Sequence, residues 1–139
     1  MAIFMGPDKE TNAVRAALGI NWALNEVIRP AIEKTWNDGT KFSSVSHGIG
    51  IDSGESLIVR GGVRDNNDLI SIGEAPNKAA KLSEVRDSYE LSITQAVYEA
   101  MSNEVAYTND KVPMWKSMQL RNEDGGQDKI FRSSYWWGL

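Results

Sequence analysis

Apolar side chains in the first part of the chain recur at three- and four-residue spacing, which is the pattern of a helix with one buried face. Asp8 stands where it can cap the start of this helix, and Pro30 predicts a kink or the end of its regular part. A short apolar run over residues 2–5 precedes the helix and predicts a strand that ends at Gly6-Pro7. The apolar positions of the predicted helix are Val14, Ala17, Leu18, Trp22, Leu24, Ile28, Ala31 and Ile32.

Short runs in the rest of the chain alternate between apolar and polar residues, as strands do. Asn37-Asp38-Gly39 predicts a turn before the first of these runs, and Asp52-Ser53-Gly54 predicts a tight hairpin between the first two. Helices are expected over residues 74–86, with Pro76 near the first position, and over residues 94–101. This mixture predicts the α+β class with a largely antiparallel sheet. The expected strands cover residues 43–51, 56–60, 69–72, 90–93, 115–120 and 129–135.

Composition limits the possible classes of protein. The length of 139 residues predicts one domain, and 41% apolar with 24% charged residues is typical of a folded globular chain. A net charge of −4 gives no general attraction to nucleic acid or to an anionic membrane. The chain has no cysteine, which excludes disulfides and thiolate metal sites, and no run long enough to cross a membrane. We therefore expect a soluble cytoplasmic protein, a single domain over residues 1–139, with no nucleic-acid partner and no membrane attachment.

Residues 47–86 carry an ordered set of glycine motifs. Gly48-Ile49, Gly54 and Gly61-Gly62 are followed by the run GEAPNKAAKL over residues 73–82. In order and spacing this set resembles the class III adenylate and guanylate cyclases, whose domains carry a Gly-Ile strand, a glycine hairpin, a second glycine pair and Gly-Asp-x-x-Asn-x-x-x-Arg-Leu. The resemblance implies a partial, ferredoxin-like class III cyclase domain, with helices packed on one face of a mostly antiparallel sheet. It also implies conversion of a ribonucleoside triphosphate to a 3′,5′-cyclic nucleotide and pyrophosphate.

Asn77 and Lys81 are the residues of this motif that carry chemistry. Four residues apart on a helix, an amide and a cation share one face, and the first turns of a helix also favour anions. In the cyclase family the matching Asn orients the ribose, and the matching Arg stabilises charge on the α-phosphate. Lys81 keeps that charge without the planar fork of arginine. The alternative is that Asn77 only caps the helix and Lys81 is a solvated surface residue.

Other positions take their expected roles from the same resemblance. Arg64 follows the glycine pair, where family members place a basic residue that reaches the triphosphate; an exposed arginine in a turn is the alternative. Ile70 stands where adenylate cyclases carry an aspartate that reads the adenine amino group, and isoleucine cannot hydrogen-bond a base. His47, the single histidine, is given no catalytic role. A further phosphate-binding lysine of the family would lie beside the last hairpin, and the spacing does not choose among Lys116, Arg121 and Lys129.

Class III cyclases hold two Mg²⁺ or Mn²⁺ ions with two aspartates, and both positions would fall upstream of Met1. None of the aspartates considered lies in either sequence context, so no metal ligand is assigned in this chain. The chain is therefore expected to lack the first strands of the domain and to be inactive alone. The aspartates considered are Asp8, Asp38, Asp52, Asp65 and Asp68.

Within the family, residues 66–70, the pattern over residues 73–82 and the aromatic C-terminus resemble the pyrimidine cyclases of bacterial antiphage (Pycsar) systems. Those enzymes make cyclic UMP or cyclic CMP as an infection signal. Because family active sites form between two chains, a homodimer or a heterodimer with a complete cyclase domain is expected. The alternative is a non-catalytic cyclase-homology module that dimerises or binds a nucleotide for regulation. Trp136-Trp137 is expected to anchor the C-terminus by packing.

Overall fold

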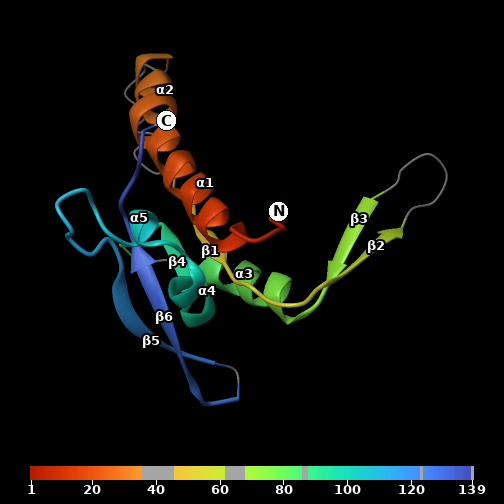
Figure 1. The fold of residues 1–139 in the computed structure, drawn as a ribbon. Coiled ribbons are helices and arrows are strands. Elements are labelled where there is room, and N and C mark those ends of the chain that lie inside the picture. The colour runs from red at the N-terminus through yellow and green to blue at the C-terminus, as the bar shows by residue number, and fades with distance from the viewer. Residues whose placement is uncertain (36–45, 62–67, 86–87, 123, 139) are drawn as a thin grey trace.

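The computed structural model describes residues 1–35, 46–61, 68–85, 88–122 and 124–138. Helices and strands are mixed along the chain and build one mixed sheet, covered by helices, and one separate hairpin (Figure 1). The elements are α1 (Lys9–Ala23), the π-helical η1 (Leu24–Ile28), α2 (Arg29–Thr35), β1 (Ile49–Ile51), β2 (Leu57–Gly61), β3 (Asp68–Ile72), α3 (Glu74–Glu84), β4 (Leu91–Thr94), α4 (Gln95–Ala100), α5 (Asn103–Ala106), β5 (Lys116–Arg121) and β6 (Gln127–Ser133).

The long N-terminal helix forms as its periodicity predicts, and it begins directly after Asp8. Asp8 occupies the N-cap position, although its side chain makes no capping hydrogen bond among the described residues. Regular α-helical bonding gives way to η1 just before Pro30, which has no N–H to donate to the preceding turn. The effect predicted for Pro30 is therefore confirmed.

Two local predictions are wrong. Residues 2–5 form no strand, because no strand in the described part of the chain pairs with their backbone. Asp52-Ser53-Gly54 does not close a hairpin, since β1 and β2 belong to different sheets. The predicted turn at Asn37-Asp38-Gly39 lies outside the described residues. The first predicted strand, over residues 43–51, begins outside them too, and within the described part only β1 is a strand.

The main sheet has the strand order β1-β4-β6-β5. β1 and β4 are parallel, whereas β4–β6 and β5–β6 are antiparallel pairs. β2 and β3 pair only with each other and form an antiparallel hairpin that projects from the body of the molecule (Figure 1). The predicted α+β class with mostly antiparallel pairing is confirmed.

Helices cover both faces of this sheet, so the expected single helical face is wrong. Ile49 and Ile51 of β1 point into the core formed with α1, α4 and α5. Gly50, between them, faces the opposite side and lies against α3. The physical reason is that β1 and β4 are parallel, and parallel neighbours need a crossover connection. α3 lies in that connection and packs on the face of the sheet that α1 does not cover.

The core lies between α1, α4, α5 and the sheet. Leu18, Leu91 and Ile93 are fully buried there, and the ring of Phe131 stacks on Tyr98 with 3.8 Å between centroids. Trp137 packs against this core while Trp136 stays 51% exposed, so only one of the two terminal tryptophans acts as the predicted anchor. In the described part of the chain, no helix combines the length and the apolar character that crossing a membrane requires.

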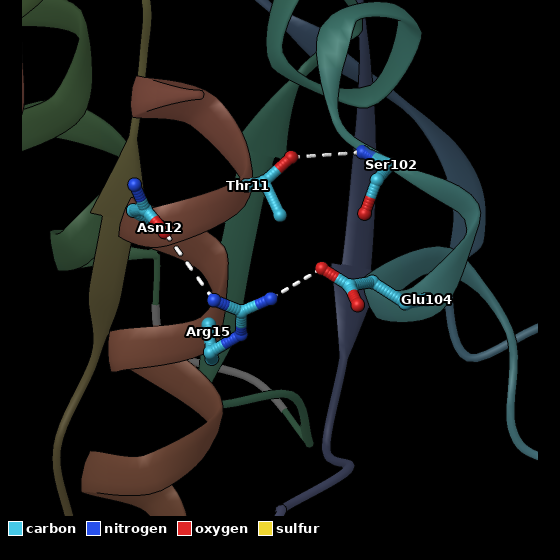
Figure 2. Close-up of polar contacts among 5 residues, drawn as sticks. All are labelled: Thr11, Asn12, Arg15, Ser102 and Glu104. Carbon is cyan, nitrogen blue, oxygen red and sulfur yellow. Dashed lines mark hydrogen bonds and ion pairs between the residues drawn. The ribbon is translucent and has the colours of Figure 1, made fainter. Parts of the chain in front are cut away.

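Polar contacts fasten α1 to the segment around α5 (Figure 2). The backbone N–H of Ser102 donates to the hydroxyl of Thr11 at 2.9 Å. Arg15 forms an ion pair with Glu104 and also donates to the amide oxygen of Asn12. These contacts fix the position of α1 relative to the core, and the exposed ion pair itself adds little stability.

Candidate functional site

Close packing against β1 determines where α3 lies. A β-carbon on residue 50 would stand 2.0 Å from the carbonyl oxygen of Ala79 and 2.6 Å from the backbone nitrogen of Ser83, so only glycine admits the helix at this distance. Ala75 and Leu82 are buried on the same side of the helix. Glu74 and Pro76 suit the first turn, where a negative charge is favoured and a missing N–H costs little.

Asn77 and Lys81 lie on the side of α3 that faces away from the sheet. Both are exposed, and their four-residue spacing places them one above the other. Lys78 points toward the sheet instead, where its ammonium lies 3.8 Å from the carboxylate of Asp128 on β6. The helix therefore presents one amide and one cation on a common outer face, as the motif predicts.

The other predicted residues do not join this face. Lys129 lies on the core side of β6, with its ammonium 5.2 Å from the centroid of the Phe131 ring, whereas α3 covers the other side. Lys116, at the start of β5, is the register partner of Arg132 on β6 and lines a separate cavity. Arg121 lies at the other end of β5.

Ile70 lies on β3, in the projecting hairpin, and is 48% exposed. Its side chain offers no hydrogen bond to a base, as the sequence indicates. Arg64 lies outside the described residues.

No group of three or more His, Cys, Asp or Glu side chains that could hold a metal occurs in the described ranges. Asp52, which follows β1, accepts a hydrogen bond from the hydroxyl of Thr94 at 2.6 Å and so connects β1 to the end of β4. The residues that the structure describes therefore do not fit a two-metal centre.

Arg132 and Asn21 are two of the buried polar residues that the sequence did not predict. The Arg132 side chain on β6 is almost fully buried; it donates to the hydroxyl of Ser92 at 3.0 Å and to the carbonyl of Val85, which follows α3. Asn21 on α1 donates to the carbonyl of Tyr135 at 2.8 Å. Nothing in the sequence indicated that these two side chains are buried, because polar residues in strands and helices are usually exposed.

Comparison with known proteins gives relatives in sequence and, separately, solved structures that share the fold. A uridylate cyclase of Xanthomonas perforans is 35% identical over 139 residues, which is all of this chain and 58% of that protein. One from Rhodovulum sp. (strain MB263) is also 35% identical, over 98% of this chain and 58% of its own length. One from Burkholderia cepacia is 42% identical over 115 residues, 83% of this chain and 48% of that protein. No protein-family model matches the chain.

Among solved structures, the guanylyl cyclase Cya2 superimposes with a TM-score of 0.73 at 16% identity, over 95% of this chain and 61% of that one. This chain has a class III nucleotidyl cyclase fold and resembles the pyrimidine cyclases. A bacterial light-regulated adenylyl cyclase superimposes with a TM-score of 0.63 at 17% identity, over 96% of this chain and 36% of that one. The cyclase fold predicted from the glycine motifs is confirmed. The chain spans about 58% of the length of the first two uridylate cyclases.

Proposed function

We propose that the protein carrying this chain is a nucleotidyl cyclase that converts a pyrimidine ribonucleoside triphosphate into the 3′,5′-cyclic nucleotide and pyrophosphate. UTP is the substrate that we expect. The observation that carries the proposal is the 35% identity to a uridylate cyclase over the whole chain. The outer face of α3 supports it, because Asn77 and Lys81 stand together there as the cyclase motif requires. In line with the antiphage cyclases that the sequence resembles, the product would serve as a signal in the bacterial cytoplasm.

In this reaction the 3′-hydroxyl gives up its proton to solvent and its oxygen bonds to the α-phosphorus, while the bond from that phosphorus to the bridging oxygen breaks and pyrophosphate leaves. Asn77 holds the ribose by hydrogen bonds, so that the 3′-hydroxyl faces the α-phosphate. Lys81 donates to an α-phosphate oxygen and stabilises the charge that grows there in the transition state. A lysine acts as a compact point charge, without the two parallel hydrogen bonds of an arginine.

The rest of the catalytic machinery comes from outside the described residues. The family uses Mg²⁺ or Mn²⁺ to neutralise the phosphates and activate the hydroxyl. Arg64 would bind the triphosphate, as the resemblance implies. Phosphate binding by Lys116 or Lys129 stays a prediction, because neither lysine lies on the outer face of α3 that carries Asn77. We infer that metal ligands are contributed by a second, longer chain, either in a homodimer of the extended protein or in a heterodimer with a complete cyclase domain.

The β2–β3 hairpin supports assembly of two chains. Leu57 and Ile72 are paired across the hairpin, lie on the same face as Ile70, and are 63% and 56% exposed. Two strands alone are marginally stable in water, so an apolar ribbon of this kind gains stability when a partner covers it.

A second candidate is a non-catalytic cyclase-homology module that binds a nucleotide or a partner for regulation. The specific observation in its favour is that the described residues contain no metal-binding group. Lys81 in place of the usual arginine points the same way. Translation of the DNA directly upstream of Met1, in the same frame, separates the two: a Gly-Asp pair shortly before Ala2 favours the enzyme, and a stop codon favours the module.

The activity itself is tested with purified protein, the four ribonucleoside triphosphates and Mn²⁺ or Mg²⁺, with cyclic products separated by chromatography. We expect the chain alone to give no product above background. The chain extended by its upstream coding sequence should give cyclic UMP, with cyclic CMP as the alternative. A purine product would overturn the pyrimidine assignment, and no product from the extended protein would favour the regulatory module.

A further inference from the structure

A cavity of about 540 Å³ lies beside the β5–β6 edge of the main sheet, apart from the nucleotide-binding face proposed for α3. None of its described lining residues belongs to α3. Aromatic side chains form much of its wall, namely Tyr89, Trp115, Tyr135 and Trp136. Tyr135 and Trp136 are 41% and 51% exposed, and exposed aromatic side chains that lie together mark binding surfaces.

Hydrogen bonds hold these walls in place. The indole N–H of Trp115 donates to the carbonyl of Val105 at 2.9 Å. The buried Asn21 holds the carbonyl of Tyr135, as described above, and Arg132 donates to the carbonyl of Tyr89 at 2.9 Å. These bonds fix the Trp115 ring and the backbone at Tyr89 and Tyr135, so this part of the cavity is in place before a ligand binds.

The charged side chains among the described lining residues of the cavity are positive. Lys116 and Arg132 line it, and no carboxylate does among the described lining residues. Arg132 is 1% exposed, and its guanidinium is hydrogen-bonded to Ser92 and to backbone carbonyls. Its charge therefore makes the electrostatic potential in the cavity more positive, but the side chain does not contact a ligand directly. Lys116 is exposed and lines the cavity, so it is the lysine that an anion bound there would meet.

We propose that this cavity binds a small aromatic anion, a planar ring system that carries one carboxylate, sulfonate or phosphate group. The ring would stack between the aromatic walls, and the anionic group would pair with Lys116. The volume lies within the range of pockets that enclose small organic molecules, about 300–1,000 Å³. The proposal is separate from the α3 face, because the cavity contains neither Asn77 nor Lys81; it assigns Lys116, one of the candidate phosphate-binding residues, to this cavity instead.

The test titrates the full chain with 2-naphthoate by calorimetry and by tryptophan fluorescence, and uses neutral 2-naphthamide as the matched ligand. We expect saturable one-to-one binding of the naphthoate and binding of the amide that is weaker by about tenfold, because a charge-assisted hydrogen bond is lost. Absence of saturable naphthoate binding, or equal binding of the two ligands, would overturn the proposal.

Variants of two lysines locate the site. Lys116→Gln should weaken naphthoate binding by about tenfold and leave naphthamide binding unchanged. Lys129→Gln is the control, because Lys129 lies on the opposite side of the same sheet. Trp136→Ala should weaken binding of both ligands, since it removes an exposed wall without altering the core. If Lys129→Gln weakens naphthoate binding as much as Lys116→Gln does, the site lies elsewhere and the proposal fails.

Discussion

At residue 50, the absence of a side chain lets the site-bearing helix lie directly on the strand. Gly50→Ala would force the α3 backbone outward, because the new β-carbon would stand 2.0 Å from the Ala79 carbonyl oxygen. We expect the free energy of unfolding to fall by about 3 kcal/mol, as for other overpacked sites. Urea unfolding followed by tryptophan fluorescence measures it.

Gly54→Ala is the matched control for that substitution. Its β-carbon would lie 3.4 Å from the β-carbon of Ala75, which is close to an ordinary contact. Its unfolding midpoint should stay near that of the unaltered chain. Equal destabilisation by the two variants would mean that the Gly50 contact does not position α3.

The pair Asn77 and Lys81 gives a prediction for the catalytically complete protein. Asn77→Ala and Lys81→Ala should each lower kcat by at least about tenfold, because each removes a group aimed at the ribose or at the developing charge. Lys81→Arg should keep or raise activity, since a guanidinium can engage two phosphate oxygens. Steady-state cyclisation rates provide the measurement.

Lys78→Ala is the internal control, because that lysine lies on the same helix but faces Asp128 on the sheet. It removes an equal charge and should change kcat little. If both site variants run at the rate of the unaltered protein with an unchanged KM, Asn77 and Lys81 are surface residues of α3 with no role in the reaction. The predicted alternative that Asn77 caps this helix is wrong, because the N-cap is Gly73.

At the scale of elements, Glu10 in the first turn of α1 joins the helix to the connection after β1. Burial alone would raise the pKa of Glu10, but hydrogen bonds from the Ser53 hydroxyl and the Lys9 ammonium outweigh it, and the pKa is lowered. A carboxyl with a lowered folded-state pKa stabilises the fold above its unfolded value of 4.5 and loses that contribution as pH falls through the folded value.

Glu10→Gln should therefore destabilise the chain at pH 7 and have less effect below pH 4.5. Urea unfolding midpoints of both proteins at neutral and acid pH test this, and the difference between them should shrink as the carboxyl is protonated. Glu99→Gln, an exposed glutamate on α4, is the control. A midpoint difference that stays constant with pH would rule out the proposed role of the Glu10 carboxylate.

Elements with strong local signals were predicted well from the sequence. The periodicity of α1, the alternation of β2 and β3, and Pro76 at the start of α3 each fix a local conformation. The failures concern pairing. Residues 52–54 have the composition of a hairpin turn, but the strands on either side enter different sheets, and pairing depends on residues far away in the chain.

At the scale of the whole molecule, the apolar hairpin face predicts self-association. Ile72→Asp places a charge in that face and should shift the chain toward monomer, because a buried unpaired carboxylate is costly. Ile58→Asp, on the other face of the same hairpin, should have less effect. Light scattering after size-exclusion chromatography gives the masses, and a strictly monomeric unaltered chain at high concentration would contradict the prediction.

The sequence predicted the fold family through its glycine order, and it predicted that Asn77 and Lys81 share a face. It could not predict that α3 would cover the side opposite to α1, because that follows from the parallel pairing of β1 with β4. It also could not separate Lys116 from Lys129, since a lysine pattern does not report which side of a twisted sheet each side chain takes.

The parallel pair also has a consequence for how the chain folds. Ile49 and Leu91 are register partners although about forty residues separate them, and α3 lies inside the loop that they close. Closing such a loop costs entropy before any contact repays it, so this pairing forms slowly. The β2–β3 hairpin within the loop needs only neighbouring residues and can form in about 1–10 μs. The surface that carries Asn77 and Lys81 is therefore expected to be completed late, after the hairpin beside it already exists.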